Sequence, residues 1–144
     1  MDFRNLFKKT SKPSTPYDCL TWNQKLAAMN LMIVFGGSCS GLPHELDKIN
    51  HIMSVEGREM GVTGAQTQAA RSMFSDMNDM VNALRGANRQ ALEKLFWAFY
   101  CIAAVGKSSN AIRVLLEVYN KLGFSEQECA SILEKKTGYK INEL

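Results

Sequence analysis

Residues 95–105 read LFWAFYCIAAV, an uncharged segment in the second half of the chain. A surface helix keeps its apolar residues on one stripe, whereas a helix that is apolar nearly all round is buried among other elements. Residues 89–94 (RQALEK) precede the segment, four of them polar or charged, and Gly106 follows it. The segment therefore predicts a helix over residues 89–105 that forms the buried centre of the domain.

Apolar residues recur with a helical period on both sides of this segment, and no run alternates as a β-strand does. The pattern predicts further helices over residues 21–35, 43–60, 63–84, 109–122 and 125–136. Two of these have a clear inner face, formed by Leu46, Ile49, Met53 and Met60 in one helix and by Ala69, Met73, Met77, Met80 and Leu84 in the next. The fold class that follows is all-α, with six to seven helices.

Two short stretches of the chain match position by position. They are MGVTGAQ at residues 60–66 and LGFSEQE at residues 122–128. In each, a glycine suits the left-handed turn that ends a helix. A Thr or Ser then caps the next helix, with Gln or Glu three residues later. The match predicts two pseudo-repeated halves of three helices each.

The chain resembles the tellurite-resistance TerB-like family in one pattern that occurs once in each half. The pattern is an apolar helix, a glycine-containing break, a second helix and this capped turn. The same fold forms the amino-terminal module of some membrane-anchored DnaJ-type co-chaperones. The resemblance covers residues 20–136 and implies an orthogonal helical bundle. It also implies a non-catalytic protein-interaction module, linked to stress or to the cell envelope of bacteria, with an unidentified protein partner or self-association.

The chain departs from the family where the family carries metal-binding acids. Those acids follow an Asp-Gly pair after the first helix of each half, but Ser40-Gly41 and Val105-Gly106 stand there in this chain. Only Glu45 falls where a family carboxylate would. The resemblance therefore implies the fold more strongly than the metal site.

A divalent-metal-binding or metal-sensing domain is the alternative function. His44, Asp47 and His51 share one face of the helix over 43–60, and such side chains ligate transition metals. This face lies opposite the apolar stripe, so a solvated surface is the competing interpretation. Glu45 and Glu56 lie nearer the apolar edge and are the candidates for a partly buried carboxylate pair. The helix over residues 63–84 has a stripe of methionines, Met73, Met77 and Met80. This stripe is either an adaptable binding surface or part of the core.

No motif for catalysis or for a cofactor stands out. A Gly-x-Ser-x-Gly elbow, a phosphate-binding loop and a dinucleotide fingerprint are all missing from the sequence. The four cysteines are scattered without a CxxC pair, which is typical of reduced thiols in a reducing compartment. We therefore expect a non-enzymatic cytoplasmic protein without a cofactor.

Residues 1–16 differ from the rest of the chain and predict a separate tail and linker before a domain over residues 17–144. The tail holds the whole net charge of +3, since the remaining 13 basic and 13 acidic residues cancel. A neutral body is a poor match for nucleic acid.

The tail also has three large apolar residues, Phe3, Leu6 and Phe7, which are spaced to share one side of a helical turn. Such a segment docks on an anionic membrane surface or in a protein groove, and a frayed terminus is the competing interpretation.

Overall fold

The computed structural model describes residues 15–37 and 43–137. Over these ranges the chain forms α-helices and short 3-10 helices and no β-strand, which confirms the all-α class. The elements in chain order are η1 (Pro16–Cys19), α2 (Trp22–Gly36), α3 (Pro43–Met60), α4 (Gly64–Ala69), η2 (Arg71–Met73), α5 (Met77–Leu84), α6 (Arg89–Val105), α7 (Ser109–Lys121) and α8 (Glu126–Thr137). Helices α3 and α6 have the bounds that the sequence predicts.

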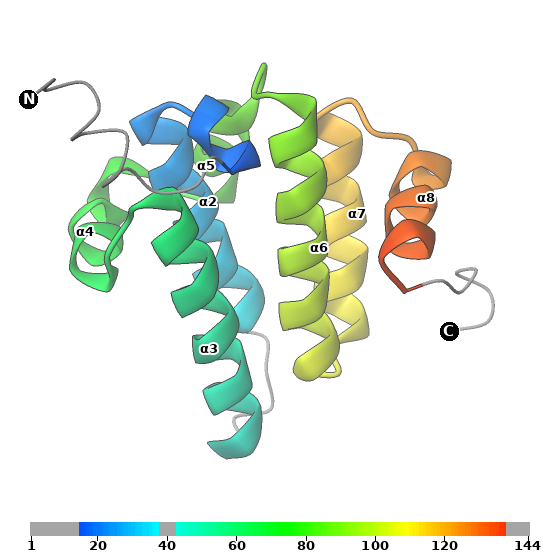
Figure 1. Cartoon of the computed structure of the whole chain (residues 1–144), viewed down its shortest axis with the longest axis horizontal. Coiled ribbons are helices and arrows are strands. Elements are labelled where there is room, and N and C mark those ends of the chain that lie inside the picture. Colours follow the sequence, from blue (N-terminus) through cyan, green and yellow to red (C-terminus); the bar gives the residue numbers. More distant parts are fainter. Residues whose placement is uncertain (1–14, 38–42, 138–144) are drawn as a thin grey trace, which may run out of the picture.

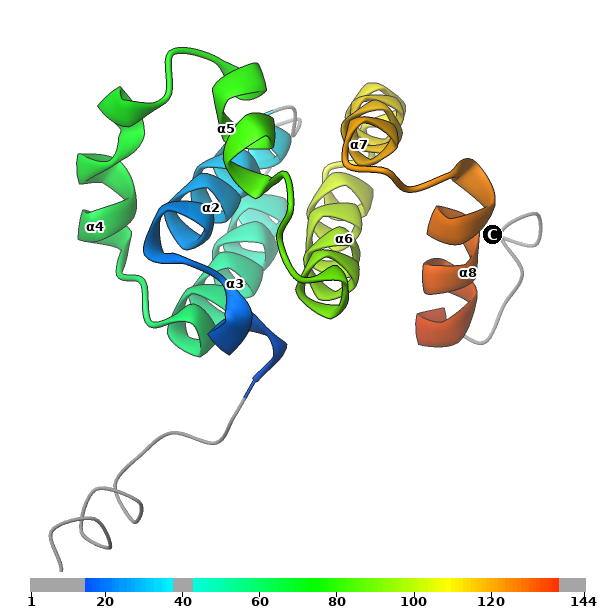
Figure 2. The ribbon, with the colours of Figure 1, turned by 90° about the horizontal axis from the view of Figure 1, so that it is seen from above.

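Two helices, α2 and α6, lie at the centre of the molecule (Figure 1). Helix α2 packs against α3, α4, α5 and α6, and α6 packs also against α7, α8 and η1. Figure 2 shows α4 at one outer edge of the molecule and α8 at the other. Within the described ranges, no helix is both long enough and apolar enough to cross a lipid bilayer.

The prediction of a single central helix over residues 89–105 is only partly right. Eight of the fifteen residues of α2 are buried, against eight of the seventeen of α6. The buried residues of α2 include the whole run from Leu26 to Met32, because four helices enclose it. The two helices therefore share the central place.

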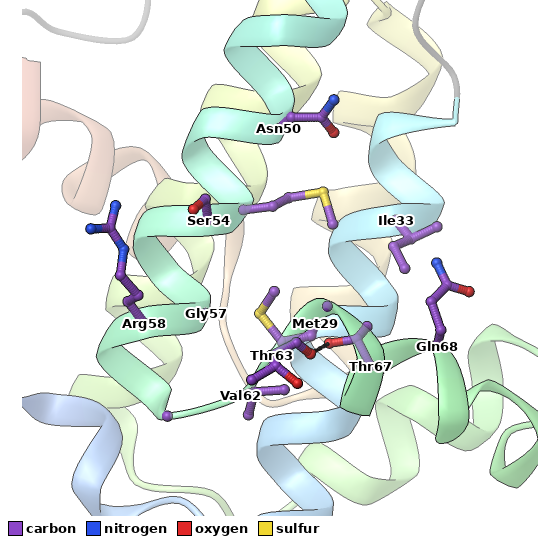
Figure 3. Close-up of a pocket in the computed structure, with 13 residues that line it drawn as sticks. Met29, Ile33, Asn50, Ser54, Gly57, Arg58, Val62, Thr63, Thr67 and Gln68 are labelled. Atoms are coloured by element: carbon purple, nitrogen blue, oxygen red, sulfur yellow. Dashed lines mark hydrogen bonds between the residues drawn. The ribbon is translucent and has the colours of Figure 1, made fainter.

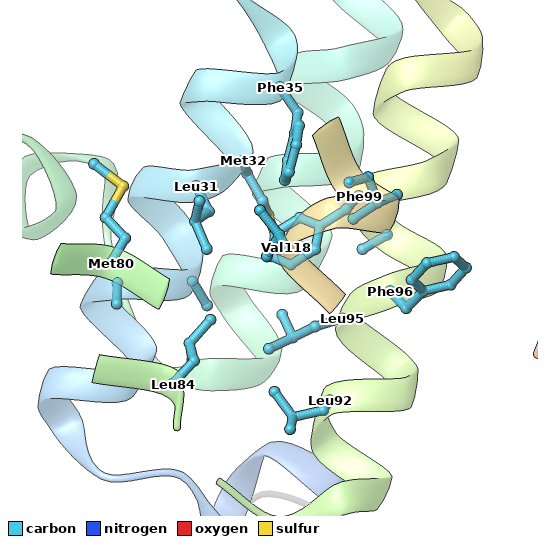
Figure 4. Packing of buried hydrophobic residues seen from close by; sticks show 14 of the residues in the cluster. Leu31, Met32, Phe35, Met80, Leu84, Leu92, Leu95, Phe96, Phe99 and Val118 are labelled. Atoms are coloured by element: carbon cyan, nitrogen blue, oxygen red, sulfur yellow. The ribbon is translucent and has the colours of Figure 1, made fainter. Parts of the chain in front are cut away.

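One continuous apolar core joins the two helices to their neighbours (Figure 4). The rings of Phe35 on α2 and Phe99 on α6 have centroids 5.1 Å apart. Tyr119 on α7 is fully buried, with its ring centroid 4.8 Å from that of Phe96 and 5.2 Å from that of Phe124. Its hydroxyl donates to the carbonyl of Leu92 at 2.6 Å. Aromatic contacts of this kind join α6, α7 and the turn before α8.

The single helix predicted over residues 63–84 is wrong, because α4, η2 and α5 take its place. Asp76 is the cause: its side chain accepts from the backbone N–H of Asp79 and begins α5. The backbone N–H of Ser75 in turn donates to the Asp79 carboxylate at 2.8 Å. Phe74 between the two helices is extended and 8% exposed, so the break also places an aromatic ring in the core.

Both glycine turns of the repeated motif have the predicted local geometry. Gly61 has φ +77° and Gly123 has φ +95°. Thr63 and Gln66 form a reciprocal capping box, and Ser125 and Glu128 form the same box before α8. The two turns are thus built alike, while the equivalence of the two halves as wholes stays a prediction.

Gly57 allows the loop after α3 to fold back against the helix. A Cβ at this position would lie 2.9 Å from the Val62 carbonyl oxygen and 3.4 Å from Cε of Met29. We expect Gly57→Ala to lower the free energy of unfolding by about 2 kcal/mol, because the backbone must move to relieve the overlap. Gly64→Ala is the control, since a Cβ there meets nothing within 4 Å. Urea unfolding of both variants measures the difference, and equal stabilities would contradict the packing role of Gly57.

Candidate functional site

Helix α3 carries all five residues of the predicted metal site, but the structure does not gather them. His44, Asp47 and His51 are exposed, as the solvated-face interpretation expects. Glu45 and Glu56 are buried at 3% and 8% exposure, yet eleven residues of helix place them about 16 Å apart along the axis. No three His, Cys, Asp or Glu side chains within residues 15–37 and 43–137 lie close enough together to hold a metal ion.

The methionines are the other predicted site within the described residues, and the structure does not align them on one helix. The methionine stripe on one helix face is wrong, because the break before α5 separates its members. Met73 is 57% exposed in η2, whereas Met77 is half-buried and Met80 is buried in α5. The inner stripe of α3 is correct for Ile49 and Met60 but not for Leu46, which is 40% exposed. Phe3, Leu6 and Phe7 lie outside the described residues, as does Ser40.

Glu56 is the centre of a polar cluster formed by residues far apart in sequence. Its carboxylate accepts a hydrogen bond from the Tyr17 hydroxyl at 2.9 Å, and the ammonium of Lys94 lies 3.2 Å from its second oxygen. Lys94 also pairs with Glu59, one turn further along α3. The Lys94 nitrogen lies 4.2 Å from the centre of the Tyr17 ring, a cation–π arrangement.

This cluster fastens η1 to α3 and α6. Tyr17 is fully buried, and burial together with the neighbouring Glu56 carboxylate raises the pKa of its phenol far above the usual value. The phenol therefore stays a hydrogen-bond donor over the physiological pH range. Every buried side-chain polar atom of the described residues has a hydrogen-bond partner, which is the arrangement expected of a structural cluster.

A pocket of about 490 Å³ opens between α2, α3 and α4 (Figure 3). Its size lies in the range of ligand sites in proteins. Its apolar walls come from α2, α3 and the loop after α3, and they consist of Met29, Ile33, Met53 and Val62. Part of the pocket wall is backbone without a covering side chain, at Gly57, Gly61 and Gly64.

Polar side chains surround the opening of this pocket. Asn50 and Ser54 reach it from α3, and Gln68 reaches it from α4 (Figure 3). All three are exposed. Thr67 is buried below them, where its hydroxyl donates to the Thr63 carbonyl at 3.0 Å. The pocket thus combines an apolar interior with an uncharged hydrogen-bonding rim, since Arg58 points outward in Figure 3.

A second, shallower groove of about 280 Å³ lies between α3 and α6. Its lining includes the half-buried side chains of Ile52 and Val55 on α3 and of Trp97 and Cys101 on α6. Glu56 forms one of its ends. Burial and the Glu56 carboxylate raise the pKa of the Cys101 thiol to about 11, so the thiol is protonated at neutral pH and is a weak nucleophile.

The sequence indicated that Glu56 lies at the edge of the apolar face of α3, but it predicted neither the pocket nor the groove. Each hollow is built from helices that are far apart in the chain, and no local spacing points to them. No family model, no curated protein and no solved structure matches the chain.

Proposed function

We propose that this chain is a non-catalytic protein-interaction module of the TerB-like type. The pocket between α2, α3 and α4 receives an aliphatic side chain of a protein partner. The observation that carries the proposal is the combination of an apolar, solvent-open interior with an uncharged polar rim.

The side chains of the pocket suit a peptide better than a charged metabolite. Met29 and Met53 are unbranched thioethers that adapt to aliphatic side chains of different shape. Asn50 and Gln68 have amide groups that both donate and accept, as a peptide backbone requires. Arg58 is the one charged residue among the described residues that line the pocket, and it points outward.

The two glycine turns support the family part of the proposal. Gly61 and Gly123 have positive φ, and each is followed by an apolar residue and a capping box. This is the device on which the TerB-like resemblance rests. The bacterial cytoplasm and a stress-linked or envelope-linked assembly belong to the proposal through that resemblance alone.

A titration with N-acetyl-leucine amide tests the pocket. In protein labelled at the methionine methyl groups, we expect saturable NMR shifts of Met29 and Met53, because both line the pocket. N-acetyl-glycine amide lacks the side chain and is the control ligand. Met80, buried on α5, is the internal control.

Ser54→Trp provides the matched variant. An indole at this exposed rim position fills the opening, so the shifts of Met29 and Met53 should be lost. Lys48→Trp adds the same side chain at an exposed position of α3 that does not line the pocket, and it should leave the titration unchanged. Equal shifts with both ligands, or with both variants, would refute the binding of an aliphatic side chain in this pocket.

A further inference from the structure

We propose that the N-terminal segment of this chain docks on its own domain, with Phe3, Leu6 and Phe7 covering the groove between α3 and α6. The inference is independent of the proposed pocket function, because the groove and the pocket lie on opposite sides of α3. Ser54 lines the pocket, and its neighbour Val55 lines the groove.

The groove offers apolar surface that no described element covers. Ile52, Val55, Trp97 and Cys101 are all half-buried, so each still presents carbon or sulfur to solvent. Trp97 stacks on Tyr100, with ring centroids 6.1 Å apart and planes inclined by 20°, and this widens the apolar face along α6. A volume of about 280 Å³ is small for a whole ligand but suits one or two side chains inserted from a segment whose remaining apolar side chain lies over the rim.

The first described residues place the N-terminal segment at one end of this groove. Tyr17 in η1 donates to Glu56, and Glu56 itself lines the groove. Helix α3 runs upward and α6 runs downward in Figure 1, with η1 beside their upper ends. The seven residues between Phe7 and Thr15 span at most about 25 Å when extended. Phe7 is therefore within reach of the whole groove.

The sequence of the tail matches an apolar groove. Its three apolar residues stand at i, i+3 and i+4, a spacing that lets them share one side of a helical turn. The basic residues Arg4, Lys8, Lys9 and Lys12 lie around them in the sequence and need no acidic partner in the groove. Glu56 is the acidic residue of the groove lining, and it is already paired with Lys94.

Trp97 is a natural reporter of docking, and Trp22 is its internal control. Trp22 is 48% exposed at the start of α2 and does not line the groove. We compare the indole N–H signals and the acrylamide quenching of the full chain with those of the variant Phe3→Ser/Leu6→Ser/Phe7→Ser. The proposal predicts that the triple variant shifts the Trp97 signal and raises its quenching, with Trp22 unchanged.

Two further samples make the test specific. A peptide of residues 1–14 added to the triple variant should move the Trp97 signal back, whereas the same peptide with the three serines should not. Val55→Glu in the full chain should reproduce the triple-variant spectrum of Trp97. Ser54→Glu, the matched neighbour that faces the other pocket, should leave it unchanged.

Three outcomes would overturn the proposal. Identical Trp97 signals in the full chain and the triple variant would show that the tail does not occupy the groove. A Trp97 shift that appears only at high protein concentration, with a dimer mass by light scattering, would assign the groove to a second copy. Binding of the full chain to phosphatidylglycerol vesicles without any Trp97 difference in solution would assign the tail to a membrane surface instead.

Discussion

Lys94→Met is expected to lower the free energy of unfolding by about 3 kcal/mol. Lys94 pairs with both Glu56 and Glu59. Methionine keeps most of the aliphatic volume but leaves two carboxylates one helical turn apart, with Glu56 in a buried position. Breaking a buried pair by removing one partner costs far more than the pair contributes, because the remaining charge is uncompensated.

Arg113→Met is the matched control for this prediction. Arg113 pairs with Glu117 at 2.8 Å on the surface of α7, where both side chains are more than half exposed. Such exposed pairs contribute less than about 1 kcal/mol. Chemical unfolding of the two variants and the wild type decides the matter. A loss for Lys94→Met no larger than that for Arg113→Met would mean that the Glu56 cluster does not hold η1 in place.

Raising the pH from 9 to 11 is expected to destabilise the domain strongly. Burial raises the pKa of the Cys101 and Cys129 thiols from 9.0 to about 11 and raises the pKa of the Tyr17 and Tyr119 phenols still further. The unfolded chain therefore loses these protons at a lower pH than the folded chain. Since the folded state then holds more protons, the stability is complete well below pH 9 and falls as the pH rises.

The size of this effect depends on how many groups stay protonated. A fully buried group that is protonated only in the folded state removes at most about 1.4 kcal/mol of stability per pH unit. Half-buried Cys101 contributes less than this limit. The thermal midpoint, measured by circular dichroism from pH 7 to 11, should stay level at first and then fall.

Removing single thiols identifies the source of the fall. Cys129 is fully buried, so Cys129→Ala should make the decline between pH 9 and 11 shallower. Cys19 is exposed, and Cys19→Ala is the matched control for removing a thiol that is not in the core. Parallel slopes for the wild type and both variants would show that buried thiols do not govern the alkaline limit.

Local signals in the sequence predicted most of the helices. The capping residues Thr21, Thr63 and Ser125 begin their helices through side-chain contacts within three residues, and such contacts can be read directly. The break before α5 was missed because methionines at helical spacing continue across it. The short-range contact of Asp76 with Asp79 ends that periodicity, and it outweighs the apolar pattern.

The candidate site could be predicted only in part. The edge position of Glu56 on α3 indicated a partly buried carboxylate, but its partners Tyr17 and Lys94 are 39 and 38 residues away. Leu46 was expected in the core because of its spacing. It lies in the first turns of α3, which project beyond the end of α6 in Figure 1. Contacts that depend on how helices pack leave no local trace in a single sequence.

Helix α3 connects the two proposals physically. Ser54 lines the pocket between α2, α3 and α4, and the next residue, Val55, lines the groove between α3 and α6. A substitution at one therefore tests one surface while leaving the other intact.

Photo-crosslinking from Ala65 tests the interaction function most directly. Ala65 is an exposed residue of α4 that follows the pocket-lining Gly64 but does not itself line the pocket, so a benzoylphenylalanine at position 65 leaves the opening free. In cells that express the full chain, it should form one discrete adduct with a partner protein. The same reagent at Lys48 is the control, because this exposed residue of α3 lies away from the pocket. We expect an adduct from position 65 that Ser54→Trp abolishes. No adduct, or equal adducts from positions 65 and 48, would contradict the interaction function.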